Sequence, residues 1–211
     1  MRNDWVSVVR ALGGDGGVAA DAAADLAARY AEPHRRYHDT AHVLAVLRDS
    51  AALAADLGLP PEERATLALA AAAHDVVYDG RPGDDERRSA EWAVSWLRRA
   101  GVRPEHVARV EELVLATLTH VAPDGDATAQ ALLDADLAIL GAEEVAYDRY
   151  RSAVRAEYAA IPDELWRTGR SAVLSDLLAR DPLYATAAAR SRWEAAAKAN
   201  LARELAALRT R

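Results

Sequence analysis

Three short segments of the chain carry side chains of the types that divalent metals accept as ligands, and the first is residues 33–43. It contains three of the six histidines, and His38 and His42 are four residues apart. If a helix already runs through both, they lie on one face; Thr40 could instead cap the helix and leave His38 in the preceding loop. Spacing alone does not decide between these arrangements.

The second segment places His74 and Asp75 at the end of a run of small, mainly apolar residues, 65–73. We expect such a run to be buried. An isolated buried carboxylate costs on the order of several kcal/mol, so Asp75 needs a cation or an arginine beside it. A structural pair in which His74 and Asp75 satisfy each other is the alternative that spacing leaves open.

The third segment, 132–140, is apolar except for two carboxylates, Asp134 and Asp136. Side chains two residues apart on a helix point about 200° away from each other, so only one of them can face a given site. With Leu133 and Leu137 toward the core, core positions flank Asp136 on both sides. We therefore favour Asp136 over Asp134.

In chain order these residues match the signature H…HD…D of the HD superfamily of metal-dependent phosphohydrolases. The chain resembles one bacterial family of predicted HD phosphohydrolases over about residues 22–208. One position departs from that pattern, because Asp85 stands where we expect Asn, which leaves the metal ligands untouched. The strings that carry the resemblance are Arg36-Tyr37-His38 with His42, His74-Asp75-Val76-Val77-Tyr78-Asp79, Asp85-Glu86 with Ser89-Ala90, Thr117 with His120, Leu133-Asp134-Ala135-Asp136-Leu137 with Leu140-Gly141, Glu157-Tyr158, Gly169-Arg170 with Val173-Leu174, and Asn200-Leu201 with Glu204-Leu205.

The resemblance implies an all-α, single-domain helical bundle of the HD type over residues 1–211. Its core would cover about 33–141, with C-terminal helices at about 142–209 packed on it. The implied metal ligands are His42, His74, Asp75 and Asp136. This mixed nitrogen and oxygen set suits Mn²⁺, Fe²⁺, Co²⁺, Ni²⁺ or Zn²⁺ better than Mg²⁺. We expect one ion per chain, with two as the alternative.

The mechanism that follows is in-line attack of metal-activated water on a phosphoester. Besides Asp75, the candidates for catalysis are Asp79, Glu86 and His120. Each has a structural interpretation as well, for instance an ion pair for Glu86 or a favourable helix C-terminus for His120. Candidates for binding the substrate are Arg36, Tyr37, His38, Tyr78 and Arg170.

We interpret His34 and His106 as ordinary surface residues. The tryptophans that fall at helical positions are expected in the core or at an interface: Trp92, Trp96, Trp166 and Trp193.

The expected substrate is a nucleotide or another small phosphorylated metabolite, since the motif residues do not identify the base, the sugar or the leaving group. Two other functions stay open. One is an HD-type di-iron oxygenase that recruits His38 and His120 as further ligands. The other is a metal- or nucleotide-binding module without turnover.

Composition narrows the classes further. There are 26 Lys and Arg against 33 Asp and Glu, a formal net charge of −7, and no cysteine. A net negative surface disfavours duplex nucleic acid as a partner, and without cysteine any metal must be held by His and carboxylates. No stretch of about 18 uninterrupted apolar residues occurs, so we expect no membrane partner and a cytoplasmic location. Homo-oligomer formation stays open.

The elements that position these residues are predicted to be helices, because Ala, Leu, Glu and Arg dominate and strict alternation is absent. Gly and Pro mark the breaks, with Pro61, Pro104 and Pro162 at helix starts. The glycine-rich stretch 13–17 is interpreted as a flexible connection. The predicted helices cover residues 18–31, 40–57, 62–78, 86–100, 104–121, 128–139, 142–159, 163–179 and 186–209.

Overall fold

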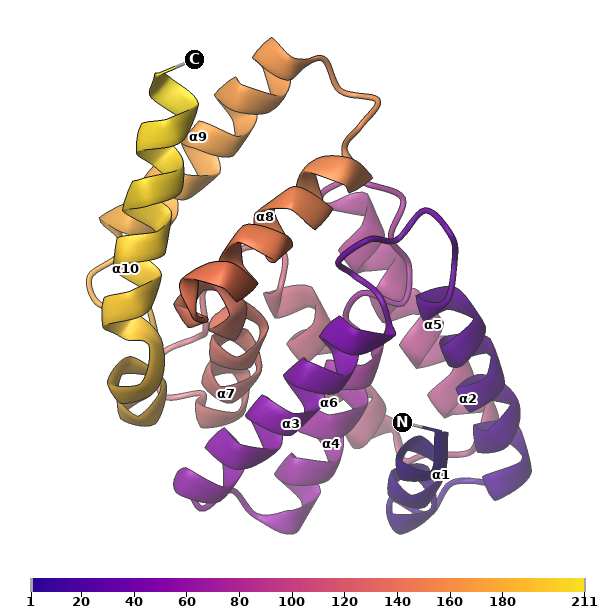
Figure 1. Ribbon diagram of the computed structural model, residues 1–211. Helices are drawn as coiled ribbons and strands as arrows, with labels where there is room; N and C mark the ends of the chain where they lie inside the picture. Colours follow the sequence, from indigo (N-terminus) through magenta and orange to yellow (C-terminus); the bar gives the residue numbers. More distant parts are fainter. Residues whose placement is uncertain (1, 211) are drawn as a thin grey trace.

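A computed structural model describes residues 2–210, and every regular element in this range is helical, which confirms the all-α class (Figure 1). No helix among these residues is both long enough and apolar enough to cross a bilayer. The elements are α1 (Arg2–Ala11), α2 (Gly16–Tyr30), α3 (Thr40–Asp56), α4 (Pro61–Ala73), α5 (Asp84–Arg99), α6 (Pro104–Ala116), α7 (Ala127–Asp136), the 3-10 helix η1 (Leu137–Gly141), α8 (Glu144–Glu157), α9 (Asp163–Ala179) and α10 (Ala187–Arg209).

Helix α1 is the one α-helix among residues 2–210 that the sequence pattern did not indicate. Its Trp5 and Val9 are buried with Leu12, at a spacing of four and three residues that gives the helix an apolar face. The Trp5 ring lies 5.6 Å from that of Trp92. The helix is short and is followed at once by the glycine stretch, so its periodicity has little room to show.

The glycine stretch 13–17 connects α1 to α2, as predicted, and its last two residues already belong to the first turn of α2. The connection is closely packed. A Cβ at Gly14 would lie 2.6 Å from a side-chain carbon of Val9, so only glycine fits there. The next residue, Asp15, caps α2 by accepting a hydrogen bond from the backbone N–H of Val18 at 2.8 Å.

Helix α4 lies at the centre of the fold and contacts α1, α3, α5, α6 and α7. Its last four residues, Ala70 to Ala73, are all buried. Because alanine is small, the neighbouring helices approach α4 closely. The C-terminal end of α4 therefore lies inside the bundle. His74 and Asp75 stand at that end.

The predicted helix 62–78 ends early, just before His74, because local polar contacts replace its next turn. The Nδ1 atom of His74 bonds the carbonyl oxygen of Ala71 at 2.9 Å. The buried guanidinium of Arg35 donates to the carbonyl oxygen of Asp75 at 2.7 Å and to that of the next residue at 3.0 Å. Those carbonyls are therefore not available for helical hydrogen bonds.

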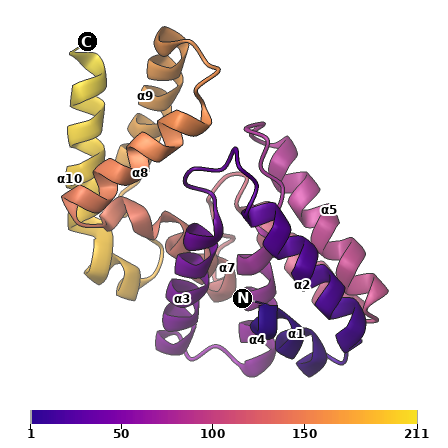
Figure 2. The ribbon, with the colours of Figure 1, turned by 45° about the vertical axis from the view of Figure 1, so that its right-hand side comes forward.

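The C-terminal helices α8, α9 and α10 form a group beside the first seven helices, and Figure 2 shows them on the side away from α1, α2 and α5. Helix α10 attaches to the core through η1. The Asn200 side chain donates to the carbonyl oxygens of Leu140 and Ala142, both at 2.9 Å. Between these two residues, a Cβ at Gly141 would lie 2.5 Å from the Cβ of Trp193. Glycine at this position lets the α10 backbone reach η1.

Replacing Gly141 by alanine is therefore expected to push α10 away from η1 and to destabilise the fold. We expect a loss of about 1–3 kcal/mol in the free energy of unfolding, measured by urea denaturation, as for other overpacked positions. The control is Gly169→Ala, at an exposed site in α9 where a Cβ meets nothing within 4 Å. That change is expected to stabilise by about 0.5–1 kcal/mol through helix propensity. Equal effects of the two substitutions would contradict the packing role of Gly141.

Candidate metal centre

His42 is positioned by the first turn of α3. The cap of this helix is Asp39 and not Thr40: its carboxylate accepts hydrogen bonds from the backbone N–H groups of Ala41 at 2.8 Å and His42 at 3.3 Å. His38 therefore lies in the loop before the helix. Of the two arrangements open from spacing, the structure shows the one in which His38 and His42 do not share a helix face.

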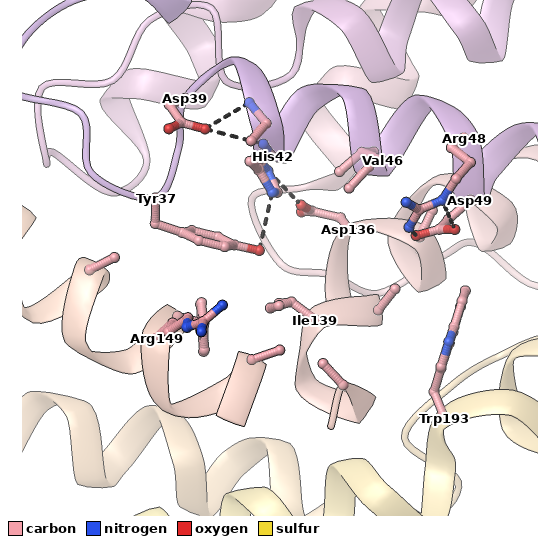
Figure 3. A pocket seen from close by; sticks show the side chains of 18 of the residues that line it. Tyr37, Asp39, His42, Val46, Arg48, Asp49, Asp136, Ile139, Arg149 and Trp193 are labelled. Carbon is pink, nitrogen blue, oxygen red and sulfur yellow. Dashed lines mark hydrogen bonds and ion pairs between the residues drawn. The ribbon is translucent and has the colours of Figure 1, made fainter. Parts of the chain in front are cut away.

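Four side chains converge at one point and are called here the His–Asp cluster: His42, His74, Asp75 and Asp136. The two histidine Nε2 atoms are 3.1 Å apart. Asp75 Oδ2 lies 3.3 Å from Nε2 of His42 and 3.1 Å from that of His74, and Asp136 Oδ1 lies 3.4 Å from each. Three elements far apart in sequence, α3, the end of α4 and the end of α7, thus deliver four donors to one place (Figure 3 shows His42 and Asp136).

The structure places Asp136, and not Asp134, in the His–Asp cluster. Asp134 is buried on the other side of α7, where its carboxylate accepts hydrogen bonds from the backbone N–H groups of Ala185 at 2.8 Å and Thr186 at 2.7 Å. These contacts hold the segment that leads into α10. The opposite directions of the two carboxylates agree with their spacing on the helix.

Hydrogen bonds on the far side of each imidazole orient the two histidines. Since Nδ1–H of His74 donates to the Ala71 carbonyl, a neutral His74 presents a lone pair at Nε2. Nδ1 of His42 lies 3.2 Å from the Tyr37 hydroxyl oxygen, a contact that orients this ring as well. In the tautomer whose Nδ1–H donates to that oxygen, Nε2 is the acceptor. Metal-binding histidines are oriented in this way by their outer partners.

The charges in the cluster compensate one another. Burial by itself raises the pKa of Asp75 and of Asp136, yet the charge of His74 and hydrogen bonds from the histidines hold both pKa values well below their usual range. Burial lowers the pKa of His42 and His74, but the two carboxylates raise both, that of His74 strongly. Two buried carboxylates therefore require positive charge between the imidazoles.

A divalent cation would meet this requirement, and the donor set fits one. One ligand atom from each of His42, His74 and Asp136 lies within 4.8 Å of the others, and Asp75 stands within 3.3 Å of both imidazoles. Imidazole nitrogen with carboxylate oxygen is the combination that first-row transition metals accept.

His120 stands at the edge of the cluster, where its Nε2 lies 2.8 Å from Oδ2 of Asp136. Its backbone has a φ of 49°, a left-handed conformation that is uncommon for residues other than glycine. Arg180 donates to the carbonyl oxygens of His120 at 2.8 Å and of Thr119 at 3.1 Å and so holds this turn. The predicted helix 104–121 ends early, at Ala116, where the hydroxyl of Thr117 donates to the carbonyl oxygen of Val114 at 2.7 Å.

Glu157, at the end of α8, fixes the loop before α3. One carboxylate oxygen accepts the backbone N–H groups of Arg36, Tyr37 and His38 at 2.7, 2.8 and 2.9 Å, and the other bonds Nδ1 of His38 at 2.7 Å. The His38 ring in turn stacks on Tyr78 at 4.1 Å. In the sequence, Glu157 stands out only as part of the string Glu157-Tyr158, because no local pattern links residues 119 positions apart.

Three other candidates from the sequence are engaged away from the cluster. Asp79 pairs with Arg88 at 2.6 Å on an exposed surface. Glu86 accepts the backbone N–H of Gly83 at 2.6 Å and so caps α5.

The third of these candidates, Arg170, is buried against Glu204, with contacts at 2.8 and 3.1 Å. Its guanidinium lies 5.4 Å from the ring of Tyr150, which packs at 4.7 Å against Tyr37. The structure therefore places Arg170 behind the site, supporting these two rings.

The structure also shows where the two histidines expected on the surface and the four tryptophans expected in the core or at an interface lie. His106 was expected on the surface and is buried in α6, which is a correction. His34 is exposed as expected, with Nε2 2.7 Å from the carbonyl oxygen of Tyr78. Of the four tryptophans, Trp92 is buried in the core, Trp96 and Trp166 are partly buried, and Trp193 lines the pocket described next.

A pocket of about 460 Å³ opens beside His42 and Asp136, between α3 and η1 on one side and α8 and α10 on the other (Figure 3). Arg36, Tyr37 and Arg149 line it. In residues 2–210 the guanidinium groups of Arg36 and Arg149 make no hydrogen bond or ion pair. The pocket thus joins the cluster to two exposed arginines whose guanidinium groups have no protein partner among these residues.

This fold and site define a class: a helical domain built around a histidine and aspartate cluster suited to a divalent metal. The model of the HD domain family matches residues 40–146, and the chain belongs to this family. HD domains bind divalent metals and are typical of metal-dependent phosphohydrolases. No curated protein and no solved structure matches the chain. The matched range contains the whole cluster, whereas Arg36, Arg149, Glu157 and Trp193 lie outside it.

Replacing Glu157 by glutamine is expected to loosen the loop before α3. Hydrogen bonds from His38 and from the loop backbone hold the pKa of Glu157 at about 2, against an ordinary 4.5, although burial raises it. Its stabilisation is therefore present above pH 4.5 and lost as the pH falls toward 2. We expect Glu157→Gln to cost about 2 kcal/mol at neutral pH.

Denaturant unfolding at several pH values measures this. The gap between the parent and the Glu157→Gln chain should shrink below pH 4.5. The control, Glu91→Gln on the exposed face of α5, should leave stability nearly unchanged at every pH. A gap that is independent of pH would show that the charge of Glu157 does not hold the loop.

Proposed function

We propose that the protein is a metal-dependent phosphohydrolase that cleaves a phosphoester of a nucleotide or of another small phosphorylated metabolite. One observation carries the proposal: two imidazole nitrogens and two carboxylates converge within 3.1–3.4 Å beside a pocket with two uncompensated arginines. Membership of the HD family supports it.

The proposed ligands are His42, His74, Asp75 and Asp136, which would hold one Mn²⁺, Fe²⁺, Co²⁺, Ni²⁺ or Zn²⁺ ion per chain. When bound, such an ion lowers the pKa of water and withdraws electron density from a phosphoryl oxygen. The outer contacts of the two histidines, to Ala71 and to Tyr37, keep both Nε2 atoms directed at the ion position.

Two tasks fall to the other side chains. We assign proton donation to His120, because its Nε2 lies 2.8 Å from Asp136 and its side chain is partly exposed at the edge of the cluster. The competing candidates Asp79 and Glu86 are engaged elsewhere. Arg36 and Arg149 would neutralise the remaining phosphate charge from the pocket wall.

Hydrolysis by metal-reloaded protein tests the proposal, with Asp136→Asn as the informative variant. We expect it to lose phosphoester hydrolysis by at least about 100-fold, because a neutral amide is a poor ligand and no longer balances the charge of the ion. The measurement is release of inorganic phosphate from a panel of nucleotides and sugar phosphates in the presence of Mn²⁺.

The matched control is Asp134→Asn, the same change two residues earlier on α7. It removes a carboxylate that holds the backbone before α10, so it should lower stability and leave metal binding intact. Full hydrolysis by Asp136→Asn, or an equal loss in both variants, would contradict the proposed site.

A further inference from the structure

The pocket has two ends of different character. At one end lie His42, Asp136 and Tyr37, and Figure 3 shows Arg149 on this side. At the other end, beyond Ile139, stands Trp193 of α10. A ligand that fills the pocket therefore spans from the His–Asp cluster to an indole ring.

Positive charge without a partner is found only toward the first end, among the described residues that line the pocket. Arg149 is uncompensated and lies on the side of Tyr37, and Arg36 is the residue before Tyr37. By contrast, Arg48 is already bound by Asp49, with contacts at 2.9 and 2.7 Å. A dianionic group is thus attracted to the cluster end and not to the indole end.

Between the ends the pocket offers small apolar side chains and no charge. Figure 3 shows Val46 of α3 and Ile139 of η1 in this part of the pocket. Further apolar lining comes from α3, η1, the residue after η1 and α8: Ala45, Ala138, Ala142 and Ala146. A volume of about 460 Å³ lies toward the lower end of the range of about 300–1,000 Å³ for small-molecule sites. This space suits an uncharged body of small-molecule size.

The indole of Trp193 is held firmly at the far end. Its backbone is pressed against Gly141, and its ring packs at 5.7 Å on Tyr184, which is buried. The ring is only partly buried and lines the pocket. Figure 3 shows the paired Arg48 and Asp49 toward the same end of the pocket as this accessible aromatic face. Together they match a planar ring whose edge carries hydrogen-bonding groups.

We infer that the C-terminal helices select the substrate: Arg149 of α8 binds the phosphate of a monophosphoester, and Trp193 of α10 stacks on a planar heteroaromatic ring in its leaving group. This inference rests on the proposed function. Both residues lie outside the range matched to the HD domain, 40–146, so they belong to this chain's own pocket wall.

Binding and turnover with two matched ligands test the inference. A nucleoside 5′-monophosphate carries the ring, and ribose 5-phosphate lacks it. Calorimetry on metal-free protein should show at least about 10-fold tighter binding of the nucleoside monophosphate, and Trp193→Leu should abolish this preference. With Mn²⁺, the same variant should lower kcat/KM about 10-fold for the nucleoside monophosphate and leave that for ribose 5-phosphate unchanged.

Further variants separate the contribution of Trp193 to ligand binding from that of Arg149. Trp193→Phe keeps an aromatic face and should retain most of the preference, whereas Trp96→Leu, in α5, should leave it intact. Arg149→Ala should weaken both ligands equally, by about 10-fold. Phenyl phosphate carries an aromatic ring without hydrogen-bonding groups on its edge. If it binds as tightly as the nucleoside monophosphate, the site does not distinguish a heteroaromatic ring from a plain aromatic one, and the inference of a heteroaromatic leaving group is wrong.

The outcomes distinguish the two proposals. Ring-dependent binding without hydrolysis by the parent protein would keep the inference and refute the proposed function. Hydrolysis with no difference between the parent and Trp193→Leu would overturn the inference and keep the function. Absence of binding of either ligand to the parent protein would also overturn the inference.

Discussion

Two carboxylates that are largely buried inside a helical bundle set the main physical constraint on this protein. Asp75 and Asp136 both lie within 3.4 Å of the two imidazoles, and their negative charge must be balanced where water has little access. The alanine-rich α4 brings His74 and Asp75 to this point by letting its neighbours approach closely. The fold thus concentrates charge that a divalent cation would balance, and a cation bound there would hold α3, α7 and the end of α4 together.

A second layer of polar contacts makes the cluster depend on distant parts of the chain. The buried Arg35 holds the turn after His74, and Glu157 holds the loop before α3 from the end of α8. Through Glu157 the position of His42 is linked to the C-terminal helices. The pocket forms along the same boundary, with the HD-matched range supplying the cluster and α8 and α10 supplying much of the facing wall.

Much of the fold could be predicted from the sequence, and the reasons are local. Composition and the Gly and Pro breaks indicated nine helices near their observed positions, and the flanking leucines favoured Asp136 over Asp134. The unpredicted features depend on contacts between residues far apart in sequence. The early end of α4 follows from Arg35, the burial of His106 from helix packing, and the role of Glu157 from a partner 119 positions away. Arg149 and Trp193 look like ordinary helix residues until α8 and α10 are placed beside the cluster.

The most direct test of the account is the metal content of the protein, counted per chain by elemental mass spectrometry after purification without chelators or an affinity metal. The account predicts one equivalent of Mn, Fe, Co, Ni or Zn in the parent chain and none in a folded His42→Ala variant. A parent chain that stays folded and binds no metal even after reloading would contradict it, and the four residues would then form a structural polar cluster.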